Sequence, residues 1–219
     1  IKRFQTGLLA KANRGYLYID EVNLLEDHLV DLLLDVAQSG ENVVEREGLS
    51  IRHASRFILI GSGNPEEGEL RPQLLDRFGL SVEVLTPDTV NERIEVIKRR
   101  DDYDNHPEEY AATWDKENRK LRNKIQKARK SLGSITVDSK ILEHCAQICI
   151  DLGSDGLRGE LTLVRTARAL AAFNGKERVD YGHIKTIAPM ALSHRLRRDP
   201  LDDAGSGTRV ERSVQKIIG

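Results

Sequence analysis

Two adjacent carboxylates follow a short apolar run near the start of the chain. The run reads Gly15-Tyr-Leu-Tyr-Ile-Asp-Glu21 and predicts a strand buried on both faces, as in a parallel sheet. Ligands of such sheets bind beyond the carboxyl ends of the strands, where Asp20 and Glu21 fall. Adjacent side chains point to opposite sides of a strand, so we expect the two acids to do different jobs. Asp20 would help to hold Mg²⁺ through water, and Glu21 would polarise a water that attacks a phosphate.

A polar amide ends a second apolar run. Phe57-Ile-Leu-Ile-Gly61 predicts another buried strand, and Asn64 follows shortly after it. Two acids after one strand could be an ordinary turn, and that alternative is about as good when the pair is taken alone. Two strands that both end in groups suited to one phosphate-and-water site are much less expected by chance. We therefore interpret Asp20 and Glu21 as the Walker B pattern of a nucleotide hydrolase.

The glycine-rich loop that cradles phosphates, G-x-x-x-x-G-K-[ST], does not occur in the 219 residues. The pair Gly175-Lys176 lacks the earlier glycine and is followed by Glu177. Because the chain begins at Ile1, we expect the loop upstream and take the chain as the C-terminal part of a longer protein. We expect the fragment alone to be inactive.

Further elements must position these groups. Apolar periodicity and turn residues predict a third strand, a β-hairpin with its turn near Glu47-Gly48, and three helices. The strand is expected at 80–85, the hairpin at 42–53, and the helices at 7–14, 26–39 and 72–78. The hairpin carries a charged tip, which suits either a plain surface hairpin or a moving loop that faces a partner or a ring pore.

The composition becomes helical after residue 90. Dense Glu, Lys and Arg predict long solvated helices at 91–101 and 107–131, and three shorter helices follow at 139–152, 157–172 and 180–196. Residues 197–207 are a polar linker that begins a polar tail. The predicted domains are 1–86, a charged helical connection at 87–134, and a small helical domain at 135–219. The fold class is therefore α/β, a partial parallel-sheet core followed by helices.

Composition narrows the function classes. The chain has 34 Lys and Arg against 35 Asp and Glu, so nothing demands a nucleic-acid or membrane-surface partner. No apolar run approaches membrane-spanning length, and a cytoplasmic protein is expected. Cys145 and Cys149 share one apolar helix face, where core cysteines are favoured over a redox pair. Metal-ligand spacing of the histidines and a nucleophile–histidine arrangement are not apparent.

These motifs together resemble those of AAA+ ATPases. They occur in order as Tyr16 to Glu21, Asn64, Leu74 to Phe78, and Leu157 to Glu160. Longer runs resemble the ATPase subunit I family of magnesium chelatase, of the bacteriochlorophyll type. These runs are Ala10 to Gly15, Asp20 to Leu25, Val44 to Gly48, Gly63 to Gly79, and His194 to Gly207.

The resemblance implies a role for each matching residue. Asn64 matches sensor 1, Arg77 the arginine finger that reaches a neighbouring subunit's ATP, and Arg158 sensor 2. Arg71 is a second candidate for such a contact between subunits. The implied fold is a partial AAA+ core followed by an all-helical lid, and the implied cofactors are ATP and Mg²⁺, the metal held by Asp20.

The resemblance also implies partners. They are a homo-oligomeric ring, commonly a hexamer, an AAA+-like subunit with an integrin-type domain, and a large porphyrin-binding subunit. The implied reaction couples ATP hydrolysis to Mg²⁺ insertion into protoporphyrin IX, with the porphyrin on a partner. Two other classes stay open: a related AAA+ remodelling ATPase, such as a MoxR-like protein or another chelatase motor, and a non-hydrolysing adaptor.

Overall fold

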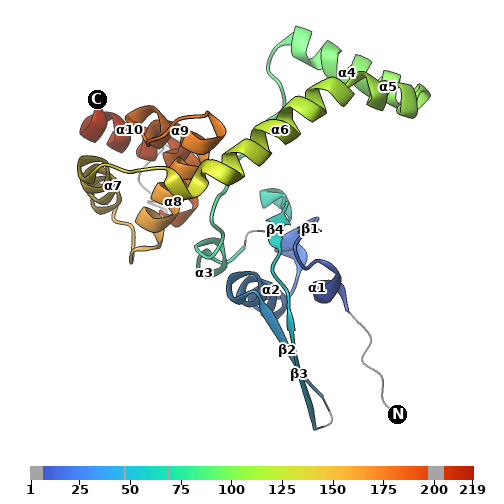
Figure 1. The fold of residues 1–219 in the computed structure, drawn as a ribbon, viewed down its shortest axis with the longest axis horizontal. Coiled ribbons are helices and arrows are strands. Elements are labelled where there is room, and N and C mark those ends of the chain that lie inside the picture. The colour runs from blue at the N-terminus through green and yellow to red at the C-terminus, as the bar shows by residue number, and fades with distance from the viewer. Residues whose placement is uncertain (1–6, 47, 69, 197–204) are drawn as a thin grey trace. The chain divides into compact units, whose positions relative to one another are not determined.

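The computed structural model describes residues 7–46, 48–68, 70–196 and 205–219 (Figure 1). They form two compact units, one that ends at Gly79 and one that begins at Leu80. The domain limits expected from the sequence, at 86 and 134, stay a prediction.

The first unit is a small α/β structure. Strands β1 and β4 pair in parallel, with Leu17 opposite Leu59 and Ile19 opposite Gly61. The first two predicted strands and the predicted hairpin are therefore confirmed. The elements are α1 (Leu8–Lys11), β1 (Tyr16–Ile19), α2 (Asp27–Ser39), β2 (Glu41–Arg46), β3 (Leu49–Ala54), β4 (Ile58–Gly61) and α3 (Pro72–Leu75), with 3₁₀ turns at Val22–Leu24 and Pro65–Glu67.

Helix α2 covers one face of the β1–β4 pair. Its buried residues Val30 and Leu34 are four residues apart and share one side of the helix, Val36 is buried on another side, and Gly40 ends the helix in the left-handed conformation. They pack in two small clusters, around Leu17 and around Leu74.

The prediction that the first strand is buried on both faces is wrong. Leu17 is buried, but Tyr16 and Tyr18 are 71% and 60% exposed. Successive strand residues point to opposite faces, and among the described residues only the Leu17 face is covered by packed side chains.

The hairpin has an ordinary antiparallel register. Val44 lies opposite Ile51, and the pair Glu41 and Arg52 is joined by a salt bridge of 3.2 Å. The predicted turn residue Glu47 lies outside the described residues.

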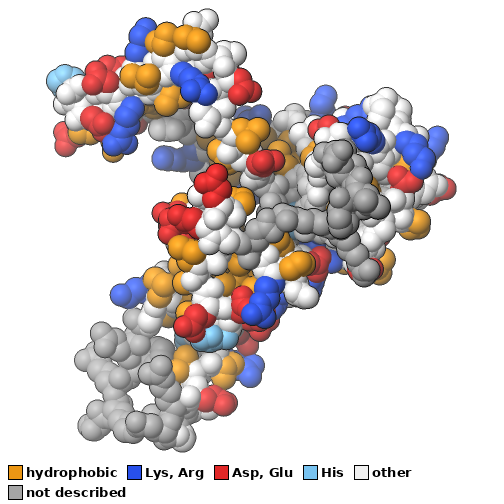
Figure 2. Space-filling view, turned by 180° about the vertical axis from the view of Figure 1, so that it is seen from behind, with side chains coloured by type: hydrophobic (Ala, Val, Ile, Leu, Met, Phe, Trp, Pro, Cys, Tyr) orange, Lys and Arg blue, Asp and Glu red, His pale blue; other side chains and the backbone are white. Residues whose placement is uncertain are grey.

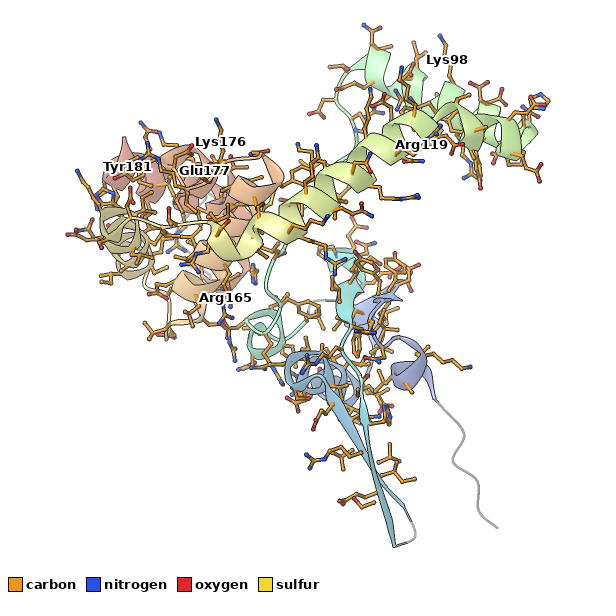
Figure 3. All side chains as sticks on the ribbon, in the orientation of Figure 1. Lys98, Arg119, Arg165, Lys176, Glu177 and Tyr181 are labelled. Carbon is orange, nitrogen blue, oxygen red and sulfur yellow. The ribbon has the colours of Figure 1, made fainter. Side chains whose placement is uncertain are left out.

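The second unit is helical throughout. It contains α4 (Val90–Asn105), α5 (Pro107–Thr113), α6 (Asp115–Ser131), α7 (Ser139–Asp151), α8 (Arg158–Phe173), α9 (Tyr181–Leu192) and α10 (Ser206–Ile218), with 3₁₀ turns at Leu132–Ser134 and Ser193–Arg195. Positively and negatively charged side chains alternate over the surface of α4 and α5 (Figure 2). Lys98 of α4 and Arg119 of α6 are two of the charged residues of these long helices (Figure 3). None of the helices within the described ranges combines the length and apolar character that crossing a bilayer requires.

The long helix predicted at 107–131 is two helices. The break falls at Trp114, next to Thr113, whose hydroxyl donates to the Tyr110 carbonyl at 2.6 Å. Such a local hydrogen bond competes with the helical pattern. Trp114 packs beside the Tyr110 ring at 6.3 Å and under the Arg99 guanidinium at 5.2 Å.

The third strand predicted at 80–85 is wrong. This segment has no regular structure, and Val84 is 90% exposed. A strand needs a neighbouring strand to pair its backbone, whereas here the Ser81 N–H donates to the Met190 carbonyl at 2.9 Å.

The prediction of a polar tail is wrong for residues 206–218. Residues 206–218 form α10, which buries Val210 and Val214 in the core of the second unit. Its Lys216 and Ser213 also bind Asp151 of α7, at 2.5 and 2.7 Å. Lys216 first, then Ser213, holds the pKa of Asp151 below its ordinary value. Residues 197–204 of the predicted linker lie outside the described residues.

Cys145 and Cys149 are free cysteines in the core of α7–α10, as predicted. They are 1% and 0% exposed, beside Ile148 and Leu163. Burial raises the pKa of Cys145 to about 11 and that of Cys149 to about 12, with the Glu160 carboxylate adding to both shifts.

Candidate active site

Backbone hydrogen bonds carry the β1–β4 pairing past the ends of the strands. The Ser62 N–H donates to the Ile19 carbonyl at 3.0 Å, and the Val22 N–H donates to the Ser62 carbonyl at 2.8 Å. Asp20 and Glu21 lie between these two contacts. The acids therefore form a turn whose two ends are both fastened to Ser62.

The Asp20 carboxylate accepts two hydroxyl hydrogen bonds on the same oxygen. Tyr18 donates to Oδ1 at 3.0 Å, and Ser62 donates to Oδ1 as well. These bonds favour the charged form, so the Ser62 hydroxyl first and the Tyr18 hydroxyl second lower the pKa of Asp20. A charged carboxylate at a strand end accepts the hydrogen bonds that the waters around a Mg²⁺ ion donate.

Glu21 has an unusual backbone for a residue with a side chain. Its φ is 52° and its ψ is 49°, the left-handed region. Its N–H donates to Ser62 Oγ at 3.3 Å, and buried Val22 begins the next turn. Left-handed residues that are not glycine cluster at functional sites. The two acids thus belong to a turn and not to strand β1. The alternation of side chains along a strand, from which the sequence predicts different jobs for the two acids, therefore does not apply to them.

Asn64 lies three residues after β4, beyond the carboxyl end of that strand, as Asp20 and Glu21 lie beyond the carboxyl end of its parallel neighbour β1. Its Oδ1 accepts from the Glu66 N–H at 3.1 Å, which caps the turn Pro65–Glu67. Its carbonyl accepts from Asn23 Nδ2 at 3.2 Å. Since Asn23 follows the acids in the chain, this bond ties the loop of Asn64 to the turn that carries them. The structure therefore joins the two loops that carry these three predicted site residues, at the carboxyl ends of the parallel strands β1 and β4.

Arg77 pairs with acids of α2. Its guanidinium contacts Asp31 at 2.6 Å and also Asp35, and its side chain is 20% exposed. Arg71 makes a similar pair with Asp27, at 2.5 Å. The three acids stand four residues apart and so share one helix face. Within this chain, both arginines are therefore paired with acids of α2. These ion pairs share no residue with the hydrogen bonds that surround Asp20.

Arg158 belongs to the second unit. It is exposed and is the first residue of α8, with Glu160 also in the first turn. A cation at a helix N-terminus opposes the helix dipole, and a bound phosphate would reverse that penalty.

The described residues hold no group of three or more His, Cys, Asp or Glu arranged for a metal ion. Mg²⁺ commonly uses one or two carboxylates together with phosphate oxygens and waters, so Asp20 alone fits that mode.

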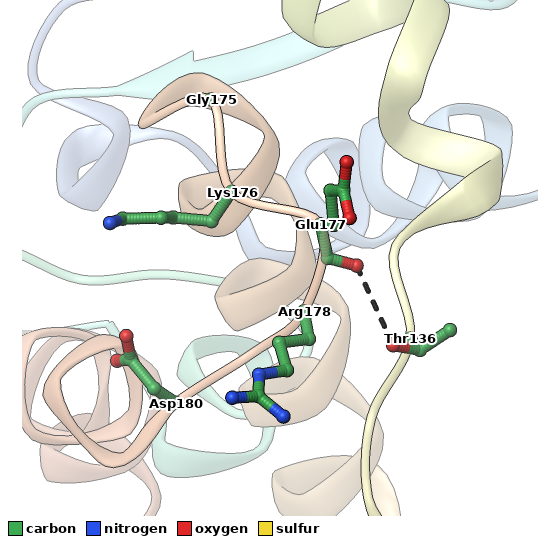
Figure 4. A pocket seen from close by; sticks show the side chains of 6 residues that line it. All are labelled: Thr136, Gly175, Lys176, Glu177, Arg178 and Asp180. Atoms are coloured by element: carbon green, nitrogen blue, oxygen red, sulfur yellow. Dashed lines mark hydrogen bonds between the residues drawn. The ribbon is translucent and has the colours of Figure 1, made fainter.

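A surface pocket occurs in the second unit, beside the turn after α8 (Figure 4). There the Thr136 hydroxyl donates to the Glu177 carbonyl at 3.5 Å. The pocket mixes two cations with two acids and contains none of the predicted site residues. Its lining is Thr136, Gly175, Lys176, Glu177, Arg178 and Asp180.

Tyr18, Asn23 and Ser62 were not predicted as part of the site. The sequence could have indicated Ser62, because this polar residue directly follows the apolar run 57–61, as Asp20 follows the apolar run 16–19. Asn23 carried a weaker signal, as a polar residue in the turn after the acids.

Known proteins resemble this chain at two levels: a domain family matches part of the helical second unit, and curated relatives match nearly the whole chain. Residues 142–217 match the AAA lid domain family. The chain is 66% identical over 217 residues to the magnesium-chelatase 38 kDa subunit of Cereibacter sphaeroides, with 99% of this chain and 65% of that subunit covered. It is 52% identical over 218 residues to the chloroplastic magnesium-chelatase subunit ChlI of Nicotiana tabacum, with 100% of this chain and 51% of the tobacco subunit covered. The chain thus spans between about half and two thirds of these relatives.

A crystal structure of an ATPase candidate from Cytophaga hutchinsonii shares the fold. Its TM-score is 0.66 at 19% identity, with 92% of this chain and 65% of that chain covered. Together with the lid match, this confirms the predicted fold class, a partial AAA+ sheet core followed by a helical lid.

Proposed function

Because the chain belongs to the family of magnesium-chelatase 38 kDa and ChlI subunits, we propose that it forms part of an ATP-hydrolysing subunit of a magnesium chelatase. Such a subunit would couple ATP hydrolysis to insertion of Mg²⁺ into protoporphyrin IX. The observation that carries the proposal is 66% identity to the bacterial subunit across 99% of this chain. The group around Asp20 supports the chemistry.

Asp20 would hold the Mg²⁺ that accompanies ATP, through water. When bound, that ion offsets negative charge on the phosphates. Tyr18 and Ser62 both donate to Oδ1 of Asp20, and the charged carboxylate that they stabilise would accept hydrogen bonds from the waters of the ion. Glu21, held in its left-handed turn, would accept a hydrogen bond from the attacking water and so polarise it.

Asn64 would place the attacking water or the γ-phosphate with its amide. Arg158 would bind phosphate from the lid, which suits a cation at the start of α8. Arg77 would reach the ATP of a neighbouring subunit, and Arg71 is a second candidate for that contact. Positive charge from arginines stabilises the charge that spreads over the phosphoryl oxygens in the transition state.

The proposed partners follow from the family resemblance. They are further copies of the subunit in a ring, commonly a hexamer, the AAA+-like subunit with an integrin-type domain, and the porphyrin-binding subunit. The substrates Mg²⁺ and protoporphyrin IX would meet on the last of these. A cytoplasmic location stays a prediction.

Substitution of Glu21 by Gln tests the hydrolytic role. The amide keeps the shape of the side chain but polarises water poorly, so we expect normal ATP affinity with turnover reduced at least about a hundredfold. Nucleotide affinity and ATPase rate are measured together in the complete protein. Glu26→Gln is the matched control, because Glu26 is an exposed acid nearby that pairs with His28 at 3.3 Å. Near-normal turnover of the Glu21 variant would contradict the assignment.

Reconstitution with the partner subunits tests the substrate. A chelatase subunit restores Mg²⁺ insertion when it is added to the other two subunits, measured by porphyrin fluorescence. A related remodelling ATPase would hydrolyse ATP without restoring insertion.

A further inference from the structure

Ser62 is fixed on both sides by its backbone. Its N–H binds the carbonyl of Ile19, the last residue of β1, and its carbonyl binds the N–H of Val22. The residues between these partners are Asp20 and Glu21. The Ser62 side chain is therefore held directly against the turn of the two acids by contacts that do not depend on its hydroxyl.

The hydroxyl itself connects the two acids. The Glu21 N–H donates to Ser62 Oγ at 3.3 Å, and Ser62 Oγ in turn donates to Asp20 Oδ1. One hydroxyl thus accepts from the backbone of one acid and donates to the carboxylate of the other. Hydrogen bonds linked in this way polarise and strengthen one another. The Tyr18 hydroxyl lies against the same two atoms, 3.0 Å from Asp20 Oδ1 and 3.2 Å from Ser62 Oγ.

We propose that Ser62 is a positioning residue for ATP hydrolysis, which sets the Asp20 carboxylate and the Glu21 turn in place together. The inference rests on the proposed function. Ser62 would not touch ATP or the attacking water. Its effect would pass through the two acids, because the left-handed backbone of Glu21 and the direction of the Asp20 carboxylate share this one hydroxyl.

The competing explanation is that Ser62 only stabilises the fold. Ser55 provides a matched comparison, since its hydroxyl also makes a hydrogen bond across the first unit, to the Leu9 carbonyl at 2.8 Å, and the residue is fully buried. Ser55→Ala should lower stability without changing the turn of the acids. Ser62→Thr keeps a hydroxyl and serves as the conservative variant.

Amide hydrogen exchange tests the proposal in nucleotide-free complete protein. Ser62→Ala removes the Oγ atom that accepts from the Glu21 N–H at 3.3 Å, so exchange at that amide should quicken about threefold to tenfold. Ser62→Thr and Ser55→Ala should leave the rate close to that of the parent protein. NMR or fragment-level mass spectrometry can follow this amide. Unchanged exchange in Ser62→Ala would overturn the proposal, and this result does not depend on any ATPase activity.

Steady-state kinetics give the second readout. Loss of a residue that orients a metal-holding carboxylate typically costs about 10-fold to 100-fold in metal affinity or activity. For Ser62→Ala we expect this loss in kcat or in the Mg²⁺ concentration at half-saturation, while KM for ATP changes by less than about threefold. Ser62→Thr should recover most of the loss. An equal defect in Ser62→Thr, or the same defect in Ser55→Ala, would refute the positioning role.

The two levels of failure are distinguishable. A parent protein without ATPase activity would refute the proposed function whatever the Ser62 variants do. An active parent protein whose Ser62→Ala variant is equally active would refute only the role of Ser62.

Discussion

Arg77 has two possible roles whose magnitudes differ enough to decide between them. Within the chain its guanidinium pairs with Asp31 and Asp35, whose side chains are 51% and 67% exposed. Pairs with such exposed carboxylates are worth about 0.2–1 kcal/mol each, so Arg77→Ala should cost roughly 0.5–2 kcal/mol of unfolding free energy. A loss of that size changes the fraction of folded protein little and leaves the turnover of folded molecules intact.

An arginine finger has a much larger effect on the rate. Such a residue supplied by a neighbouring subunit is worth about 10³ or more in kcat, which corresponds to at least about 4 kcal/mol of the barrier. We therefore expect Arg77→Ala to reduce kcat about a thousandfold while ATP affinity and folding stay near normal. The assays are ATPase rate, nucleotide titration and urea unfolding of the complete protein.

The double variant Asp31→Asn with Asp35→Asn is the control. It removes the charge partners of Arg77 but keeps the guanidinium, so it should lose similar stability to Arg77→Ala. Under the finger role its kcat stays within about tenfold of the parent protein, because the arginine is still present. Equal kcat for the two variants would refute the finger and leave only the ion pairs.

Mixing two inactive variants adds a test of the subunit boundary. Arg77→Ala and Asp20→Asn should partly restore ATPase activity when mixed, because some interfaces then join an intact Arg77 to an intact Asp20. A tagged pull-down shows that the two variants share a ring, and rings that combine the parent protein with either variant show that mixed rings can be active. If the rings of the two variants then recover no ATPase activity, Arg77 does not act between subunits.

Three other predictions concern the second unit. Val210→Ala in α10 should lower the unfolding free energy by about 1–3 kcal/mol in urea titrations, because Val210 is fully buried, whereas Val84→Ala, at a site 90% exposed, should change it by less than about 0.5 kcal/mol. The pKa values of Cys145 and Cys149, raised to about 11 and about 12 from the ordinary 9.0, keep both thiols protonated, so iodoacetamide at pH 8 should modify them only after unfolding. Because the native state retains protons that the unfolded chain releases, stability should fall as pH rises from about 9 towards 11, and Cys→Ala substitution at both positions should reduce this fall. Labelling of native protein at the rate of a free thiol would contradict the burial argument.

The order of apolar runs and polar ends in the sequence was enough to predict the edge that carries Asp20, Glu21 and Asn64. Each of these residues follows a local signal, a strand that ends in a polar side chain. Ser62 follows the same kind of signal, but its role depends on the register that places Gly61 opposite Ile19. A one-residue shift would turn the hydroxyl to the other face. Local sequence does not determine that register, so the link between the two acids could not be predicted.

The partners of Arg77 show a similar limit. Asp27, Asp31 and Asp35 are visibly four residues apart in the sequence, which predicts an acidic helix face. That this face meets the segment after α3 is a property of packing between elements. The α10 helix is a different case, because Val210, Val214 and Ile217 have helical spacing that could have been recognised. The turn residues before it, such as Pro200 and Gly205, favour a polar tail instead.

Tyr18 connects the failed burial prediction to the site. Aromatic residues in an apolar run predict a buried strand, and that inference treats tyrosine as a hydrophobic side chain. Tyrosine also carries a hydroxyl that seeks a hydrogen-bond partner. In this chain Tyr18 stays 60% exposed, and its hydroxyl reaches Asp20 at 3.0 Å. Because β1 ends at Ile19 and Asp20 begins the turn after it, the Tyr18 hydroxyl meets the carboxylate just beyond the end of the strand. The apolar run that leads to Asp20 thus also contains a hydrogen-bond partner for this acid, Tyr18, two residues before it.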